Sequence, residues 1–200
     1  AYFFLFVSYF PQLLQGPINR YDKMKDQFFG QHNWNTEQSK RALLLIGFGL
    51  MKKFAIADML AGSVSDVFDG SVQGIPGSLI VFAIFLYAIQ QYADFSGGID
   101  IVLGVSELFG IKMMPNFRQP YFSVSLGDFW RRWHISLGAW MRDYVFYPFA
   151  LTKTMQRFGK WCSQKLGKHF GRVLPAGIAN LLVFFLVGIW HGAQLHYVLC

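Results

Sequence analysis

The stretch Ser78–Tyr92, SLIVFAIFLYAIQQY, decides the fold class of this chain because it contains no charged residue. Pro76 and Gly77 precede it and Gly97 and Gly98 follow it, so residues that break helices flank one long apolar run. An uninterrupted run of this length predicts a helix rather than a strand. About 20 helical residues cross a bilayer, so we expect a membrane span over residues 78–97.

The composition of the 200-residue chain also favours a membrane protein. Apolar residues make up 54% and charged residues 14%, against about 25% charged residues in an average soluble protein. A soluble domain with so few charges would not cover its surface, and the same apolar content excludes disorder. Two cysteines exclude a disulfide scaffold, and the sequence has no Cys-x-x-Cys or His-x-x-x-His pair. We therefore expect no metal site.

Further segments predict more membrane helices. Ala176–Leu199 follows Pro175 and is a second span, while Arg41–Gly62 is a third, with Asn35 as its N-cap. Two lysines, at 52 and 53, interrupt the third span, so this helix is tilted, lies in the interface or snorkels its lysines.

Two further short segments contain residues that interrupt helices. Residues 94–98, DFSGG, fit either a cavity lining or the end of the first span, and we prefer the helix end. The prolines in residues 11–17, PQLLQGP, break a helix at membrane depth. Non-helical backbone at that depth is tolerated only in a protein interior or a cavity.

The charge distribution predicts the topology. Lys and Arg are absent between Phe54 and Ile111, whereas residues 151–175 carry six basic residues and no acidic one. Beside long apolar segments, the positive-inside rule explains this asymmetry better than nucleic-acid binding does. We therefore expect Lys112–Arg172 in the cytoplasm, the loop Asp66–Gly74 outside, and no nucleic-acid partner.

The segment Asp128–Tyr144, DFWRRWHISLGAWMRDY, has a different pattern. As one helix it would place five mainly aromatic residues on one stripe: Trp130, Trp133, Leu137, Trp140 and Tyr144. Arg132, Ser136 and Asp143 would cluster on the opposite face. Tryptophan with arginine is typical of a membrane interface. The pattern fits either a peripheral helix in the headgroups or a helix that lines a site.

Two histidines are candidates for chemistry. His191 follows the uncharged run Gly177–Trp190 and lies about 22 Å along a helix counted from Ala176, inside an apolar core of about 30 Å. An ionisable group at that depth normally faces a cavity or a polar partner, and desolvation keeps an imidazole neutral, as a general base requires. The alternative is a structural histidine bonded to a neighbouring helix. His134, next to the tryptophan stripe, is by itself more typical of a solvated interface residue.

Six motifs occur in a fixed order along the chain. They are residues 10–20 (FPQLLQGPINR), 92–100 (YADFSGGID), 116–121 (NFRQPY), 129–137 (FWRRWHISL), 140–144 (WMRDY) and 188–192 (GIWHG). Together they resemble the membrane-bound O-acyltransferase (MBOAT) family, in its bacterial branch of alginate O-acetylation proteins and teichoic-acid D-alanyltransferases. Members of that family are longer, so the resemblance implies a single MBOAT domain over residues 1–200 that is truncated at both ends.

The resemblance implies an all-α fold: a polytopic transmembrane helical bundle with interfacial and re-entrant helices, multi-pass in the bacterial cytoplasmic membrane. A cytoplasmic acyl thioester, acetyl-CoA or an acyl carrier, is the donor, and no cofactor is bound. Hydroxyls of an extracytoplasmic polysaccharide accept the acyl group. The implied partners are the lipid bilayer and an extracytoplasmic SGNH-type transferase.

The resemblance also implies roles for residues. His191 matches the histidine of the Trp-His-Gly motif and would be the base, and His134 would orient the donor or polarise its carbonyl. Arg131 and Arg132 would meet an anionic donor such as coenzyme A. Further candidates for substrate binding are Asn116, Asp143 and Trp190.

The sequence leaves alternatives open for the acyl group and for the class of function. The pair Arg131-Arg132 and residues 144–148, YVFYP, are closer to the polysaccharide O-acetylation branch, so acetyl is preferred over D-alanyl. A transporter with His191 as a proton relay, or a scaffold, are the alternatives from other classes. A relay predicts further ionisable groups at membrane depth, and residues 176–199 offer only His191 and His196.

Overall fold

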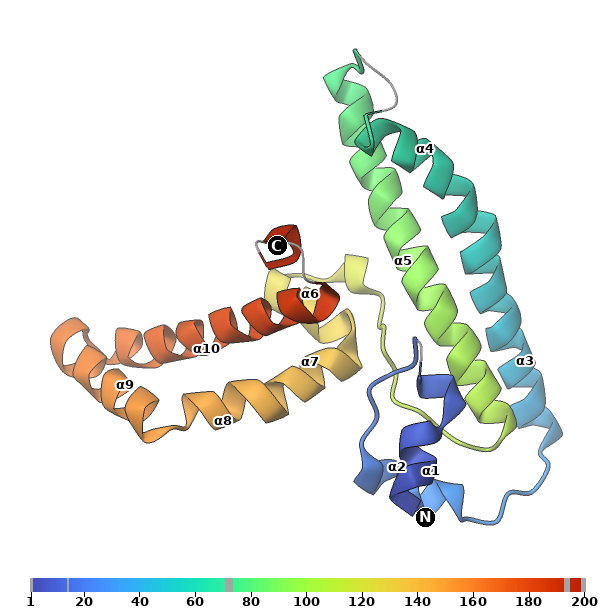
Figure 1. Cartoon of the computed structure of the whole chain (residues 1–200), viewed down its shortest axis with the longest axis horizontal. Coiled ribbons are helices and arrows are strands. Elements are labelled where there is room, and N and C mark those ends of the chain that lie inside the picture. Colours follow the sequence, from blue (N-terminus) through green and yellow to red (C-terminus); the bar gives the residue numbers. More distant parts are fainter. Residues whose placement is uncertain (1, 14, 71–73, 193–194, 199–200) are drawn as a thin grey trace. The chain divides into compact units, whose positions relative to one another are not determined.

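The computed structural model describes residues 2–13, 15–70, 74–192 and 195–198, and every regular element within these ranges is helical (Figure 1). The chain divides into two compact units, Ala1–Ser136 and Leu137–Cys200. Among the described residues, two helices are long and apolar enough to cross a membrane: α5 (Gly77–Leu108) and α10 (Lys168–His191). They overlap the spans predicted over residues 78–97 and 176–199. That residues 1–200 form a single domain stays a prediction.

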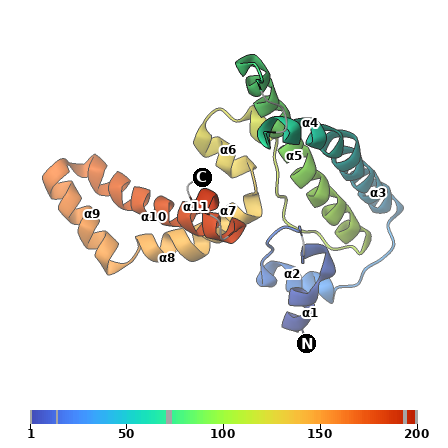
Figure 2. The same cartoon turned by 45° about the horizontal axis from the view of Figure 1, so that its top comes forward.

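A helical hairpin dominates the first unit (Figures 1 and 2). Its first arm is a continuous run of α3 (Thr36–Leu50), the π-helical turn η2 (Met51–Ala57) and α4 (Asp58–Phe68). Its second arm is α5, which packs along all three. The side chain of Asn35 accepts a hydrogen bond of 3.1 Å from the N–H of Gln38, which confirms the predicted N-cap.

Helix α5 continues through residues 94–98, so the predicted helix end at DFSGG is wrong. A Cβ at Gly97 would lie 2.8 Å from the carbonyl oxygen of Gly49, and one at Gly104 would lie 2.7 Å from that of Ala42. These glycines therefore allow the backbones of the two arms to approach closely. The resulting packing offsets the cost of about 1 kcal/mol that a glycine imposes inside a helix.

The amino-terminal part of the first unit contains the predicted proline break. Helix α1 (Tyr2–Ser8) ends before Pro11, the 3-10 turn η1 (Phe10–Gln12) follows, and residues 15–20 have no regular structure before α2 (Tyr21–Phe28). The hydroxyl groups of Tyr9 and Ser106 are hydrogen-bonded at 2.8 Å, which ties this part to α5.

The second unit begins within α7 (Ile135–Met141). It continues with the π-helical turn η4 (Arg142–Phe146), α8 (Tyr147–Ala150), α9 (Lys153–Leu166), α10 and α11 (Leu195–Val198). Helices α9 and α10 pack together and meet at Gly167, whose φ of 96° is accessible to glycine.

The bounds predicted for the second span are wrong. Helix α10 begins at Lys168, contains Pro175 and ends at His191, where Gly192 forms the C-cap with an extended backbone. Glycine at this position commonly ends a helix. Residues 193–194 and 199 of the predicted span, residues 71–73 of the predicted outer loop and the side chain of His196 lie outside the described part of the chain.

Candidate functional site

A buried polar cluster lies where α6 (Leu126–Arg132) gives way to α7. Asn116 and Ser136 are each 1% exposed and His134 is 8% exposed. The Oδ1 of Asn116 accepts hydrogen bonds from the N–H of Ser136 at 3.1 Å and from its hydroxyl at 2.8 Å. The same oxygen lies 3.2 Å from Nδ1 of His134. The Oγ of Ser136 accepts in turn from the N–H of Ile18 at 3.0 Å.

These contacts assign the protons of His134. A backbone N–H can only donate, so the Asn116 atom that Ser136 contacts is the carbonyl oxygen. An amide oxygen can only accept, so Nδ1 of His134 carries the hydrogen in their contact. In the neutral ring, Nε2 then has the lone pair and is the atom that can accept a proton. The cluster therefore selects one tautomer.

The backbone at His134 breaks the helix that the sequence predicted over Asp128–Tyr144. His134 has a φ of 46°, in the left-handed region that residues other than glycine rarely adopt. Two hydrogen bonds of 2.9 Å hold the break: Arg118 N–H donates to the carbonyl of Arg132, and Ile135 N–H donates to that of Asn116. The prediction of one helix with a continuous tryptophan stripe is therefore wrong, because residues 116–118 replace the helical hydrogen-bond partners at this point.

Aromatic rings pack around His134. The ring of Phe95, on α5, meets the imidazole edge to face with centroids 4.8 Å apart. Phe117 lies 5.0 Å from both Phe95 and Trp133. Trp133 thus packs inside the first unit instead of extending a stripe of rings along one helix. The rings limit the access of water to this side of the imidazole.

The two arginines before Trp133 differ in their surroundings. Arg131 is exposed, and its Nε donates to the carbonyl of Gly127 at 3.1 Å. Arg132 forms an ion pair with Asp128, with Nε and Oδ2 2.9 Å apart. The hydrogen bond from Arg132 holds the pKa of the Asp128 carboxyl below its usual value. Arg131 is therefore the arginine that presents its charge to solvent.

In the second unit, His191 is the last residue of α10. Its Nδ1 donates to the carbonyl oxygen of Val187 at 2.8 Å, so the lone pair of the neutral ring is again on Nε2. The Trp190 ring lies 4.9 Å from the imidazole, and both side chains are exposed. The depth predicted for His191 in a bilayer stays a prediction.

The last candidate from the sequence, Asp143, lies in η4, which packs against α10. Its Oδ1 accepts from Nε of Arg142 at 3.1 Å. The prediction that Arg132, Ser136 and Asp143 share one helix face is wrong, because the helix is interrupted at His134.

A buried ion pair between η2 and α5 was not predicted from the sequence. The ammonium of Lys52 pairs with Asp100, donates to the hydroxyl of Ser96 at 2.9 Å and lies 5.7 Å from the ring centroid of Tyr92. Lys52 is 8% exposed. The three arrangements that the sequence left open for this helix in a bilayer stay predictions, and the pairing of its lysines across the hairpin was not foreseen.

The neighbouring lysine is paired as well. Lys53 contacts Asp94 of α5 at 2.6 Å and Asp58 of α4 at 2.8 Å. The sequence signal for these ion pairs was two adjacent lysines, together with acidic residues in a helix that has no basic residue. Which lysine pairs with which acid depends on the register of the hairpin. Within the described ranges, His, Cys, Asp and Glu side chains form no group of three that could hold a metal ion. The expectation that no metal takes part stays a prediction.

The comparison with protein families identifies the class. Residues 1–200 match the membrane-bound O-acyltransferase family, and the chain therefore belongs to the MBOAT family of polytopic membrane acyltransferases.

The curated relatives are named either as O-acetylating enzymes or as D-alanyltransferases. The probable alginate O-acetylase AlgI of Pseudomonas syringae pv. tomato is 35% identical over 98% of this chain and 34% of its own length. The peptidoglycan O-acetyltransferase of Helicobacter pylori is 35% identical over 94% of the chain and 33% of its own length. The teichoic acid D-alanyltransferase of Bacillus subtilis is 32% identical over 97% of the chain and 47% of its own length. The chain spans about a third of the length of the first two relatives.

Proposed function

We propose that the protein transfers an acyl group, acetyl in the first place, from a cytoplasmic thioester to hydroxyls of an extracytoplasmic cell-envelope polysaccharide. The observation that carries this proposal is the family match over residues 1–200, together with relatives named as O-acetylases of alginate and peptidoglycan. Acetyl-CoA or an acyl carrier is the donor. The protein acts in the bacterial cytoplasmic membrane, beside an extracytoplasmic SGNH-type transferase.

His191 is the proposed general base. Its Nδ1–H bond to Val187 leaves Nε2 of the neutral ring able to accept the proton of the acceptor hydroxyl. As the hydroxyl oxygen attacks the thioester carbonyl, the new C–O bond forms and the C–S bond breaks. The imidazolium then returns its proton to the departing thiolate, so the products are an ester and a thiol.

His134 and Asn116 are proposed to position the donor. The Asn116 oxygen fixes the imidazole tautomer, and burial of the pair restricts ring rotation. Nε2 of His134 is the atom that would contact the donor, and exposed Arg131 would meet the donor phosphates. Trp190 and Asp143 are proposed to contact substrate beside His191, and Arg132 contributes charge while it pairs with Asp128.

The acyl group is tested by mass spectrometry of the cell envelope in cells with and without the full-length protein. We expect O-acetyl esters to disappear without the protein and D-alanyl esters to persist. Loss of D-alanyl esters instead supports the alternative, transfer to teichoic acid, for which the Bacillus subtilis relative at 32% identity is the specific observation. No change in either ester overturns both assignments.

A further inference from the structure

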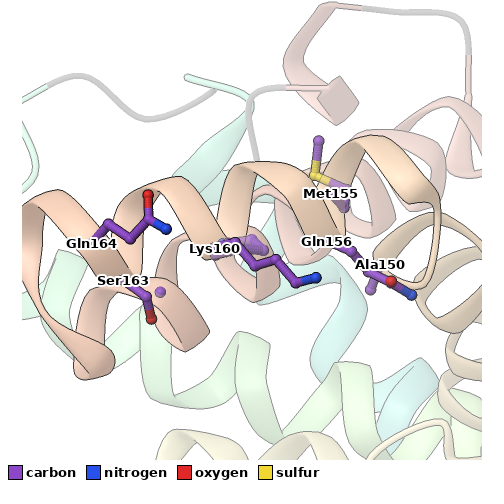
Figure 3. A pocket seen from close by; sticks show the side chains of 9 residues that line it. Ala150, Met155, Gln156, Lys160, Ser163 and Gln164 are labelled. Carbon is purple, nitrogen blue, oxygen red and sulfur yellow. The ribbon is translucent and has the colours of Figure 1, made fainter.

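A groove of about 560 Å³ with both polar and apolar lining lies between α9 and α10 in the second unit (Figure 3). Helix α9 supplies most of its polar groups, and α10 contributes backbone. The lining includes Gln156, Gly159, Lys160, Ser163, Gln164 and Gly171. None of these residues belongs to the site proposed for acyl transfer.

Glycines at the helix crossing give the groove its form. A Cβ at Gly159 would lie 2.9 Å from the carbonyl oxygen of Gly171, and a Cβ at Gly171 would collide with the hydroxyl of Ser163. Larger residues would therefore fill the groove or separate the helices. Pro175 has no N–H, so it cannot donate the helical hydrogen bond to the carbonyl of Gly171. The groove thus combines an ammonium, a hydroxyl, two amides and a backbone acceptor.

The groove lies where α10 changes from polar to apolar. Lys168 and Arg172 lie before Pro175, and the uncharged run Gly177–Trp190 lies after it. When α10 crosses a bilayer, this transition falls at the level of the lipid headgroups. On α9, Trp161 is 54% exposed, as is typical of a helix that lies in the interface.

The chain segment that forms the groove carries charge of one sign. Residues 151–175 contain six basic residues and no acidic residue: Lys153, Arg157, Lys160, Lys165, Lys168 and Arg172. Such a surface attracts anions, and beside a bilayer it attracts anionic lipids.

From this combination we propose that the groove binds the headgroup of an anionic phospholipid. The Lys160 ammonium, the Ser163 hydroxyl and the amide groups of the two glutamines donate to the phosphate oxygens. The carbonyl of Gly171 accepts from a hydroxyl of the headgroup. A phosphate on a soluble molecule offers the same chemistry, but exposed apolar side chains on the two helices that form the groove, Trp161, Leu166 and Phe170, favour a ligand with acyl chains. This site is independent of the acyl-transfer proposal.

The test uses the purified, delipidated full-length protein and native mass spectrometry of retained lipid. The probes are phosphatidylglycerol and phosphatidylcholine, which differ in net charge. We expect phosphatidylglycerol to bind more tightly and Lys160→Gln to weaken it about fivefold, as expected for one basic residue facing an anionic lipid. Lys165→Gln, with the same charge change on the same helix but outside the groove, leaves binding close to wild type. Ser163→Ala weakens it about threefold without a change in charge.

Three results overturn the proposal. The first is equal binding of the two lipids, which shows no preference for an anionic headgroup. The second is equal weakening by Lys160→Gln and Lys165→Gln, which indicates a diffuse basic surface instead of a groove. The third is displacement of phosphatidylglycerol by soluble glycerol phosphate at matched concentration, which assigns the groove to a soluble phosphate. Lys160 is exposed, so its substitution leaves the helix packing intact.

Discussion

Lys52 and Lys53 are adjacent in sequence but differ in burial, and replacing each by Met tests the ion pairs of the hairpin. The Lys52 side chain is 10% exposed and pairs with Asp100, which is 19% exposed. The Lys53 side chain is 39% exposed, and its partners Asp94 and Asp58 are 43% and 45% exposed. Methionine removes the charge in both variants and keeps an unbranched apolar side chain.

The two variants are expected to differ strongly in stability. Lys52→Met leaves a largely buried carboxylate without its cation, and breaking a buried pair in this way costs about 3–5 kcal/mol. Lys53→Met removes two exposed pairs, each of which contributes about 0.2–1 kcal/mol. Because the penalty comes from the uncompensated Asp100, the double variant Lys52→Met/Asp100→Leu recovers most of the loss.

The assay is equilibrium unfolding of the purified full-length protein in mixed micelles, with helicity followed by circular dichroism. The free energy of unfolding should fall in the order wild type, Lys53→Met, Lys52→Met, with the double variant above Lys52→Met. Equal losses for the two single variants would refute the argument from burial. A double variant less stable than Lys52→Met would refute the uncompensated charge as the cause.

Three further predictions concern packing and chemistry. Gly97→Ala places a Cβ 2.8 Å from a carbonyl oxygen across the hairpin and costs about 1–3 kcal/mol in the same unfolding assay, whereas Gly62→Ala meets nothing within 4 Å and stabilises its helix by up to about 1 kcal/mol. Asn116→Ala releases the tautomer of the histidine it contacts and lowers kcat about 10- to 100-fold at an unchanged protein level; an unchanged kcat refutes the positioning role. Arg131→Ala combined with Arg132→Ala raises the donor KM in a salt-dependent way, and an unchanged KM removes both from the donor site.

The helical hairpin shows what the sequence could predict. The apolar run Ser78–Tyr92 and the N-cap at Asn35 are local signals, and both correspond to observed structure. The end of α5 was misplaced because glycines normally weaken a helix. Two close approaches explain why they lie inside one: the backbone of Gly49 lies against Gly97, and the side chain of Gln15 lies against Gly98. The pairing of Lys52 with Asp100 also depends on this register.

In the candidate site, too, local sequence signals could be recognised, whereas features that depend on tertiary contacts could not. The sequence motif singled out His134 as a candidate, and its role in the site stays a prediction. The left-handed backbone of this residue was not visible in an amphipathic pattern that continues through it. The break exists because residues distant in sequence supply hydrogen-bond partners on both sides of it. Asn116 accepts from the N–H groups of Ile135 and Ser136 after the break, and the N–H of Arg118 donates to the carbonyl of Arg132 before it. A proton relay would need ionisable groups at membrane depth, and two acidic groups of α5, Asp94 and Asp100, are paired with lysines across the hairpin.

The most direct test of the account replaces His191 by Ala in the full-length protein and measures O-acyl esters of the cell envelope by mass spectrometry. His169→Ala is the matched control, since His169 is an exposed histidine on the same helix outside the motif. Membrane levels of each variant are compared by immunoblot. The account predicts that the esters vanish in His191→Ala and persist in His169→Ala, with both proteins present. Normal ester content in His191→Ala would contradict the assignment of His191 as the base for acyl transfer.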